Sequence, residues 1–179
     1  QASRAICLAT ARQLDLSQRA TDAGEKAKAA ARCALLTPVA KAFSTDCGSE
    51  VASLGIQIHG GSGFIEATGA AQHYRDARIL QIYEGTNGVQ AIDLVTRKLP
   101  LDGGNVLRGY LGELAATVAE FKQSAPAGSG VAAERLGEAV SALGSASEAI
   151  GRMLADNPDR ALAVATPYLR LFRLTAGGW

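Results

Sequence analysis

Glycine-bearing breaks divide this 179-residue chain into segments whose apolar residues recur at helical spacing. Over residues 2–16, Ile6, Ala9 and Leu16 fall on one stripe, which is typical of an amphipathic helix. The sequence HGGSG at 59–63 ends the next apolar pattern, because three glycines in five residues cost too much backbone entropy inside a helix. The chain is therefore expected to fold as helices packed along their apolar faces.

Amino-acid composition favours the same fold class. Apolar residues make up 47% of the chain and aromatic residues only 5%, so the apolar share is mainly alanine, leucine, valine and isoleucine. This bias favours packed helices over a β-sandwich. We predict an all-α helical bundle over residues 1–100 and an additional helical segment over 101–179, with the boundary in the sequence LPLDGG at 99–104.

Cap residues predict where two of the helices start. Thr37 is a good N-cap and Pro38 suits a first helical position, where its missing N–H loses no hydrogen bond. A long helix is expected from there to residue 58. Thr86 is expected to cap another helix over 87–98. The inward side chains of that second helix are expected to be Val89, Ile92 and Val95.

The remaining segments follow the same pattern. Further helices are expected over 68–82, 105–123 and 131–155, with a loop over 124–130. The sequence DNPDR at 156–160 predicts the cap of a last helix that reaches the C-terminus.

Charge and cysteine usage exclude several classes of function. The net charge is +1, and the segment 101–179 carries seven basic against eight acidic side chains, which argues against a nucleic-acid-binding face. No metal site is expected, because the three cysteines and two histidines show no ligand spacing. No stretch reaches the ~18 apolar residues of a membrane span and no signal peptide is visible, so a reduced, cytoplasmic protein is expected.

Glu84 is the first candidate for a chemical role. It lies beside Gly85, whose backbone can bend sharply and approach a ligand, and just before the helix start at Thr86, whose free N–H groups favour an anion. A carboxylate base beside an anion-binding helix end would suit an active site. The alternative is that Glu84 only favours the helix N-terminus electrostatically and that Thr86 only caps it.

Two more stretches are candidates. QIHGGSGF at 57–64 could form a nest of backbone amides for phosphate, or a tight turn that lets two helices pack closely. It has neither the lysine of a P-loop nor a preceding strand. YRDARI at 74–79 is interpreted as scaffold, in which Arg75, Asp76 and Arg78 form ion pairs that hold the helix beside Glu84.

These stretches, in the order QIHGGSGF, YRDARI and IYEGTNGVQ, resemble the C-terminal domain of the acyl-CoA dehydrogenase family over residues 1–98. Each stretch is weak alone, but the ordered set is specific. The resemblance implies that Glu84 is the base that removes the α-proton of an acyl-CoA thioester, while the β-hydrogen leaves as hydride to FAD. It also implies that the Glu84 N–H polarises the thioester carbonyl and that the product is the trans-2-enoyl-CoA. Family branches that place the base on another helix lack a glutamate here.

The resemblance also assigns cofactor and substrate residues by position. The segment that reaches the FAD of a neighbouring subunit corresponds to Gln57, Ile58, His59, Gly60 and Gly61. The segment that touches FAD in the same active site corresponds to Thr86, Asn87 and Gly88, and a glycine at 88 leaves only a backbone contact there. The substrate neighbours of Glu84 are Tyr83 and Gly85. Because one subunit completes the flavin site of another, an obligate homo-oligomer is implied.

Residues 101–179 resemble the extra helical segment of longer bacterial family members, including those that act on 3-methylmercaptopropionyl-CoA and similar short substrates. In those members the extension occupies a surface that tetrameric relatives use for assembly, so a homodimer is implied. The family's N-terminal helical domain and middle β-barrel would precede Gln1. The chain is therefore expected to be an inactive fragment of an enzyme that passes electrons to an electron-transfer flavoprotein.

Two other interpretations stay open. One is a non-catalytic helical oligomerisation module that keeps the family's fold. The other is a DNA-associated relative of the family, against which the balanced charge of residues 101–179 argues.

Overall fold

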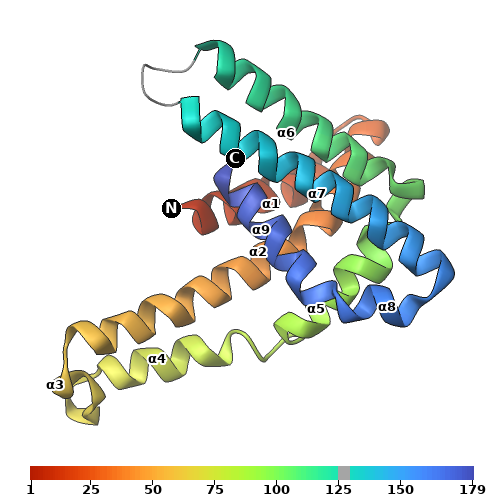
Figure 1. Ribbon diagram of the computed structural model, residues 1–179. Helices are drawn as coiled ribbons and strands as arrows, with labels where there is room; N and C mark the ends of the chain where they lie inside the picture. The colour runs from red at the N-terminus through yellow and green to blue at the C-terminus, as the bar shows by residue number, and fades with distance from the viewer. Residues whose placement is uncertain (125–129) are drawn as a thin grey trace.

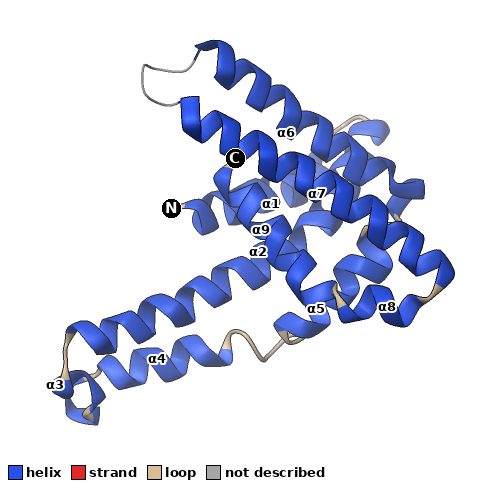
Figure 2. Ribbon diagram, viewed as in Figure 1, coloured by secondary structure: helices blue, strands red, loops and turns tan. Residues whose placement is uncertain are grey.

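The computed structural model describes residues 1–124 and 130–179, and all regular elements within them are helical (Figures 1 and 2). The first part of the chain forms α1 (Ala2–Arg19), α2 (Ala23–Ile58), α3 (Gly61–Phe64), the 3-10 turn η1 (Glu66–Thr68) and α4 (Ala70–Ile79). It continues through α5 (Asn87–Asp93), the π-helical turn η2 (Leu94–Lys98) and the 3-10 turn η3 (Leu101–Gly104). The C-terminal part forms α6 (Asn105–Ser124), α7 (Gly130–Asp156), α8 (Pro158–Ala163) and α9 (Ala165–Gly178). The prediction of an all-α fold is confirmed.

Helix α2 contains Pro38 in its interior, so the expected helix start at this position was wrong. The Thr37 hydroxyl does not cap a helix but donates to Cys33 O at 2.7 Å. The helix begins fifteen residues earlier, at Ala23, where Asp22 accepts the Glu25 N–H as the N-cap. An interior proline costs about 3 kcal/mol. Burial of neighbouring side chains such as Val39, which is 0% exposed, offsets that cost.

A single hydrophobic core joins α1, the first half of α2 and the elements that follow residue 87. Its fully buried large side chains are Leu35 and Val39 of α2, Leu94 and Val95 of η2, Leu114 of α6, Leu143 of α7 and Phe172 of α9. Tyr110 of α6 stacks on Phe172 with the ring centroids 5.7 Å apart. The division of the chain at 99–104 stays a prediction about sequence organisation, and the core crosses it.

The second half of α2 extends away from this core and pairs with α4, with α3 at the far end (Figure 1). We call residues 47–79 the arm and the rest of the described chain the body. The arm leaves large apolar side chains exposed, including Ile58 at 84% and Phe64 at 81%. At its tip, a Cβ added to Gly63 would lie 2.4 Å from Ile56 O, so this glycine allows the chain to fold back closely.

The residues that α5 and the following turn η2 bury in the core differ in part from those that the sequence pattern predicted. Val95 is buried as expected, but Val89 and Ile92 are 52% and 46% exposed. Ala91 and Leu94 are buried in their place. The reason is that α5 packs against both α2 and α9, and the small Ala91 lets it approach them closely.

The C-terminal helices lie close to their expected limits. The expected loop at 124–130 lies, apart from its two end residues, outside the described residues. Asn157 caps α8 by accepting the N–H of Asp159 at 3.1 Å. A break at Val164 then separates α8 from α9, so the expected last helix consists of two helices.

Candidate active site

The connection between α4 and α5 holds Glu84 in a left-handed backbone conformation. Its φ is 53°, and Gly85 follows with φ 86°. For a residue with a Cβ, this conformation costs on the order of 1–3 kcal/mol. A Cβ at position 85 would also lie 3.1 Å from Gln90 Nε2. The Glu84-Gly85 pair therefore forms a strained turn and not a simple interruption of a helix.

Two side chains hold the backbone of this turn. Lys41 Nζ donates to Gly85 O at 2.7 Å, and Gln90 Nε2 donates to Glu84 O at 3.3 Å. Strained backbone persists only where surrounding contacts over-determine it, and such strain is concentrated at functional sites. Lys41 comes from α2 and Gln90 from α5, so two packed helices position the turn.

The functional groups of Glu84 are open to a ligand. The residue is exposed, and the adjacent Tyr83 is 48% exposed. Within residues 1–124 and 130–179, neither the Glu84 N–H nor its carboxylate is engaged in a hydrogen bond. Both the carboxylate and the backbone donor of this residue are thus free of hydrogen bonds to the described part of the chain.

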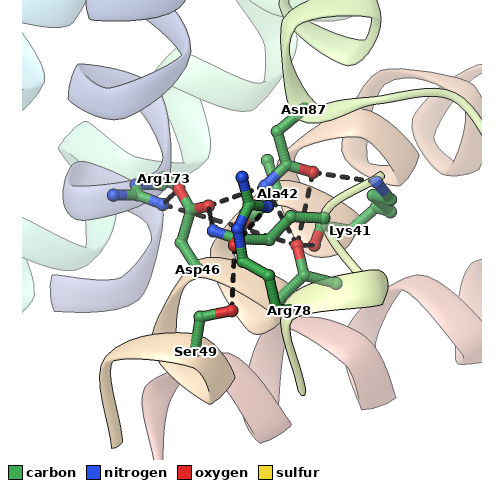
Figure 3. A network of polar contacts seen from close by, with 9 residues as sticks. Lys41, Ala42, Asp46, Ser49, Arg78, Asn87 and Arg173 are labelled. Atoms are coloured by element: carbon green, nitrogen blue, oxygen red, sulfur yellow. Dashed lines mark hydrogen bonds and ion pairs between the residues drawn. The ribbon is translucent and has the colours of Figure 1, made fainter. Parts of the chain in front are cut away.

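Asp46 of α2 is the centre of a polar network beneath this turn (Figure 3). Its Oδ1 accepts from Gln81 Nε2 at 2.5 Å and from Asn87 Nδ2 at 2.7 Å. Its Oδ2 accepts from Arg173 of α9. Asn87 Oδ1 in turn accepts from Lys41 Nζ at 2.9 Å, and the Asn87 N–H donates to Gln81 O at 3.1 Å. These contacts tie both ends of the turn to α2.

Lys41 places a positive charge next to this network. Partial burial lowers the pKa of its ammonium, while the negative charges of Asp46 and Glu84 act in the opposite direction and raise it. Burial is the larger effect, so the pKa of Lys41 is lowered, and the two carboxylates, one of which is the candidate base, offset part of that change.

Sequence reasoning missed Lys41, Asp46, Gln81 and Arg173. Lys41 and Asp46 are polar positions near the middle of a long apolar helix pattern, which was a usable sign of a polar partner. Arg173 lies 127 positions from Asp46, and no local pattern connects the two.

The two segments assigned to FAD lie at opposite ends of the arm. The residues at its tip are all exposed and comprise Gln57, Ile58, His59, Gly60 and Gly61. The residues at its base comprise Thr86, Asn87 and Gly88. Thr45 Oγ1 lies 3.3 Å from Asn87 Oδ1, and the α-helical rise from Thr45 to the tip corresponds to about 20 Å. One chain therefore does not bring the two segments together.

Both segments nevertheless have exposed backbone. A Cβ at Gly60 or Gly61 would meet no atom within 4 Å, so this loop is open on its outer side. Thr86 caps α5 by accepting the Val89 N–H at 3.2 Å, as expected, and Gly88 is exposed. The buried Gly63 has the packing role that was the alternative for this loop.

The stretch YRDARI contributes scaffold contacts, mainly through its arginines. Arg75 forms an ion pair with Glu66 at 2.5 Å, on the surface of the arm. Arg78 donates to Gln81 Oε1 at 3.0 Å and so joins the network beneath the turn. Asp76, expected to pair with an arginine, is exposed.

Residues 1–124 and 130–179 contain neither a metal-binding cluster nor a helix that could cross a membrane. No group of three or more histidine, cysteine, aspartate or glutamate side chains there could hold a metal ion. None of the helices in these ranges combines the length and hydropathy needed to span a lipid bilayer.

The fold and the site together define a helical domain that presents a carboxylate on a strained, braced turn. A family model described as the acyl-CoA dehydrogenase C-terminal domain matches residues 1–99. A second model, described as acetyl-CoA dehydrogenase C-terminal like, matches residues 110–179. The chain belongs to the acyl-CoA dehydrogenase family, whose members are oxidoreductases, and the resemblance stated from three motifs is confirmed.

Individual relatives agree with this assignment. The 3-methylmercaptopropionyl-CoA dehydrogenase of Ruegeria pomeroyi is 42% identical over 100% of this chain and 30% of that protein. The human mitochondrial short-chain specific acyl-CoA dehydrogenase is 36% identical over 40% of this chain and 16% of that protein. The crystal structure of Caenorhabditis elegans ACDH-11 in complex with C11-CoA has the same fold, with TM-score 0.68 and 23% identity over 98% of this chain and 29% of that one. The chain thus spans less than a third of the length of these proteins.

Proposed function

We propose that this chain is the C-terminal part of a FAD-dependent acyl-CoA dehydrogenase that oxidises an acyl-CoA thioester to the trans-2-enoyl-CoA. The observation that carries the proposal is the Glu84 turn, where a left-handed residue is braced from two helices while its carboxylate and N–H stay open. Membership of the acyl-CoA dehydrogenase family supports this reaction class. The presence of a relative that is 42% identical over the whole chain supports a short acyl-CoA substrate.

In this proposal Glu84 supplies two groups to one reaction step. Its carboxylate accepts the α-proton, and its N–H donates to the thioester carbonyl oxygen. The α-proton is weakly acidic until that carbonyl is polarised, because negative charge forms on the oxygen as the proton leaves. The braced turn fixes the backbone from which both groups project. Tyr83 and Gly85 flank the substrate on either side of the base.

FAD, when bound, would supply the acceptor for the hydride that leaves the β-carbon. The exposed Thr86 and the backbone of Asn87 and Gly88 would contact it beside Glu84. The open loop at the tip of the arm, which includes Gly60 and Gly61, would contact the FAD of another subunit. The distance of about 20 Å between the two segments supports this division of roles.

The same reasoning extends to assembly and partners. A site completed by a second copy requires a homo-oligomer, and the exposed apolar side chains of the arm supply surface for such an interface. We favour a dimer, with electrons leaving to an electron-transfer flavoprotein in the bacterial cytoplasm. The 179-residue chain alone would then be inactive.

The test is the Glu84→Gln variant of the complete native protein. Glutamine keeps the size and the N–H of Glu84 but removes the base. The rate of flavin bleaching by a saturating short acyl-CoA should fall by about 10²- to 10⁴-fold, with the bound flavin retained. Glu120→Gln, at an exposed position on α6, is the matched control and should leave the rate unchanged.

Two outcomes would contradict the proposal. Unchanged bleaching in Glu84→Gln would remove Glu84 from the mechanism. A native protein that holds no flavin would instead favour the non-catalytic oligomerisation module, for which the exposed apolar arm is the supporting observation.

A further inference from the structure

Arg173 connects the C-terminal extension to the polar network beneath the Glu84 turn. It lies on α9, and its side chain is only 16% exposed. Its guanidinium donates to Asp46 Oδ2, lies 3.4 Å from Ala42 O through the same nitrogen, and stands 5.9 Å from the centre of the Phe43 ring. All three contacts are with one turn of α2. Figure 3 shows Arg173 meeting Asp46 from the side opposite Asn87 and Lys41.

The contacts continue from Asp46 to the backbone that carries Glu84. Asp46 Oδ1 accepts from Asn87 and Gln81, which lie at the two ends of the turn. Asn87 accepts from Lys41, and Lys41 holds Gly85 O. One continuous path of hydrogen bonds therefore runs from α9 to the residue beside the candidate base.

The charges explain why this path depends on Arg173. Asp46 has a side chain that is 33% exposed, and Arg173 supplies a cation to its Oδ2. Lys41 is the other cation attracted to Asp46. Without Arg173, the uncompensated carboxylate would draw the Lys41 ammonium toward itself and away from Gly85 O. The turn would then lose its shortest backbone contact.

We propose that Arg173 is a positioning residue through which the C-terminal extension holds the Glu84 turn in its reactive conformation. The inference rests on the proposed role of Glu84 as the base. It gives the segment 101–179 a part in the chemistry, in addition to its part in the core.

Arg32 provides a matched control for this proposal. Its guanidinium bonds both carboxylate oxygens of Glu113, at 3.0 and 2.5 Å, and so also joins α2 to the extension. Its side chain is 12% exposed, close to the value for Arg173, and it lies over the Tyr110 ring at 4.6 Å. Arg32 makes none of the contacts around Asp46. Loss of either arginine removes one inter-helix ion pair, but only the Arg173 pair is linked to Glu84.

The experiment compares Arg173→Met, Arg173→Lys and Arg32→Met in the complete native protein. Hydrogen–deuterium exchange of the peptide over 82–89 measures whether the turn is held. Single-turnover bleaching of the bound flavin by acyl-CoA measures proton abstraction. Arg173→Met should raise exchange in this peptide and lower the bleaching rate about 10- to 100-fold, because small misplacements of a base have effects of this size.

The two other variants separate positioning from general packing. Arg32→Met should change neither readout at the turn. Arg173→Lys should restore most of the rate, because Asp46 is reached through a single nitrogen that a lysine can replace. If Arg173→Met does not accumulate as folded protein, Arg173→Gln takes its place with the same expectations.

The proposal is overturned if exchange at 82–89 is unchanged in Arg173→Met, if Arg32→Met has the same effects, or if exchange rises without a fall in rate. Failure of the proposed function has a different signature, namely that the native protein itself does not bleach with acyl-CoA. In that case the exchange comparison alone decides whether Arg173 holds the turn.

Discussion

The body and the arm are both built from helices, but they bury their apolar residues differently. In the body, Leu35, Leu94 and Phe172 are fully buried in one core that several helices share. In the arm, Leu54 and Ile58 are 54% and 84% exposed, although they lie on the same continuous helix α2 as Leu35. An amphipathic pattern thus predicts that one face of a helix will be covered. It does not predict whether the covering surface comes from the same chain or from another one.

This difference separates two roles within α2. Its first half is fixed by the core, and the network around Asp46 lies where the body ends and the arm begins. Its second half carries the open glycine loop outward. The Glu84 turn is therefore braced by the well-packed region, whereas the tip that we propose to contact flavin lies in the region whose apolar side chains are exposed.

The largest expected effect is a loss of core packing in the body. Phe172→Ala should lower the free energy of unfolding by about 3–5 kcal/mol, because it leaves a cavity in a fully buried site. Urea denaturation followed by circular dichroism measures this. Ile58→Ala in the arm, the matched control, should cost less than about 0.5 kcal/mol. Equal losses would show that the arm belongs to the same packed unit as the body.

Alkaline pH should destabilise the body through its buried tyrosines. Burial raises the pKa of Tyr168 to about 12, against the opposing hydrogen bond with Ser147. The unfolded value is about 10, so the fold favours the neutral form, and this contribution is complete below pH 10 and lost as pH rises toward 12. The loss is on the order of 2–3 kcal/mol.

The measurement is the urea midpoint of the native chain and of Tyr168→Phe between pH 9 and pH 12. The variant should show a shallower fall, since its ring cannot ionise and Ser147 keeps its bond to Leu143 O at 2.6 Å. Identical pH profiles would contradict the assignment to Tyr168. Tyr110, whose pKa burial also raises to about 12, accounts for part of the remaining slope.

A smaller effect is expected at the arm tip. Gly63→Ala would place a Cβ 2.4 Å from Ile56 O, and the backbone shift needed should cost about 1–3 kcal/mol. Gly61→Ala points into open space and should change stability by less than about 0.5 kcal/mol. Thermal unfolding of the two variants compares them directly. A larger loss for Gly61→Ala would mean that the open face of the loop is covered.

The smallest change in the free energy of unfolding is expected when an exposed apolar residue of the arm is replaced by a polar one. Ile58→Ser should shift the free energy of unfolding of the 179-residue chain by less than about 0.5 kcal/mol. In the complete native protein it should weaken self-association, measured by sedimentation velocity, because an exposed apolar patch of this kind marks an interface. Unchanged association would show that the arm is not part of the subunit contact.

Much of the fold could be predicted from local sequence patterns. The glycine breaks at 59–63 and 84–85, the cap at Thr86 and the limits of α6 and α7 depend on residues close in sequence, and the structure has them near the expected positions. The start of α2 was wrong, because Thr37-Pro38 is a good local start that the surrounding core overrides. The buried face of α5 was also wrong, since its contacts are with distant helices.

The candidate site was predictable in part for the same reason. Glu84 was found because its glycine and capping neighbours are adjacent in sequence and because the motif order resembles a known family. Lys41 and Asp46 were not found, since their partners in the network lie 35 or more residues away. Their contacts with the Glu84 turn are made by the packing of distant segments and not by sequence spacing.

The sequence by itself determined the helical fold class, the places where helices break, the family and the candidate base, because these depend on local backbone preferences and on short motifs. The tertiary structure decided that Pro38 stays inside a helix, that Glu84 adopts a left-handed conformation and that Arg173 reaches Asp46. Each of these has a local cost or a distant partner. Only the free energy of packing between helices far apart in the chain can compensate such a cost and create such a contact.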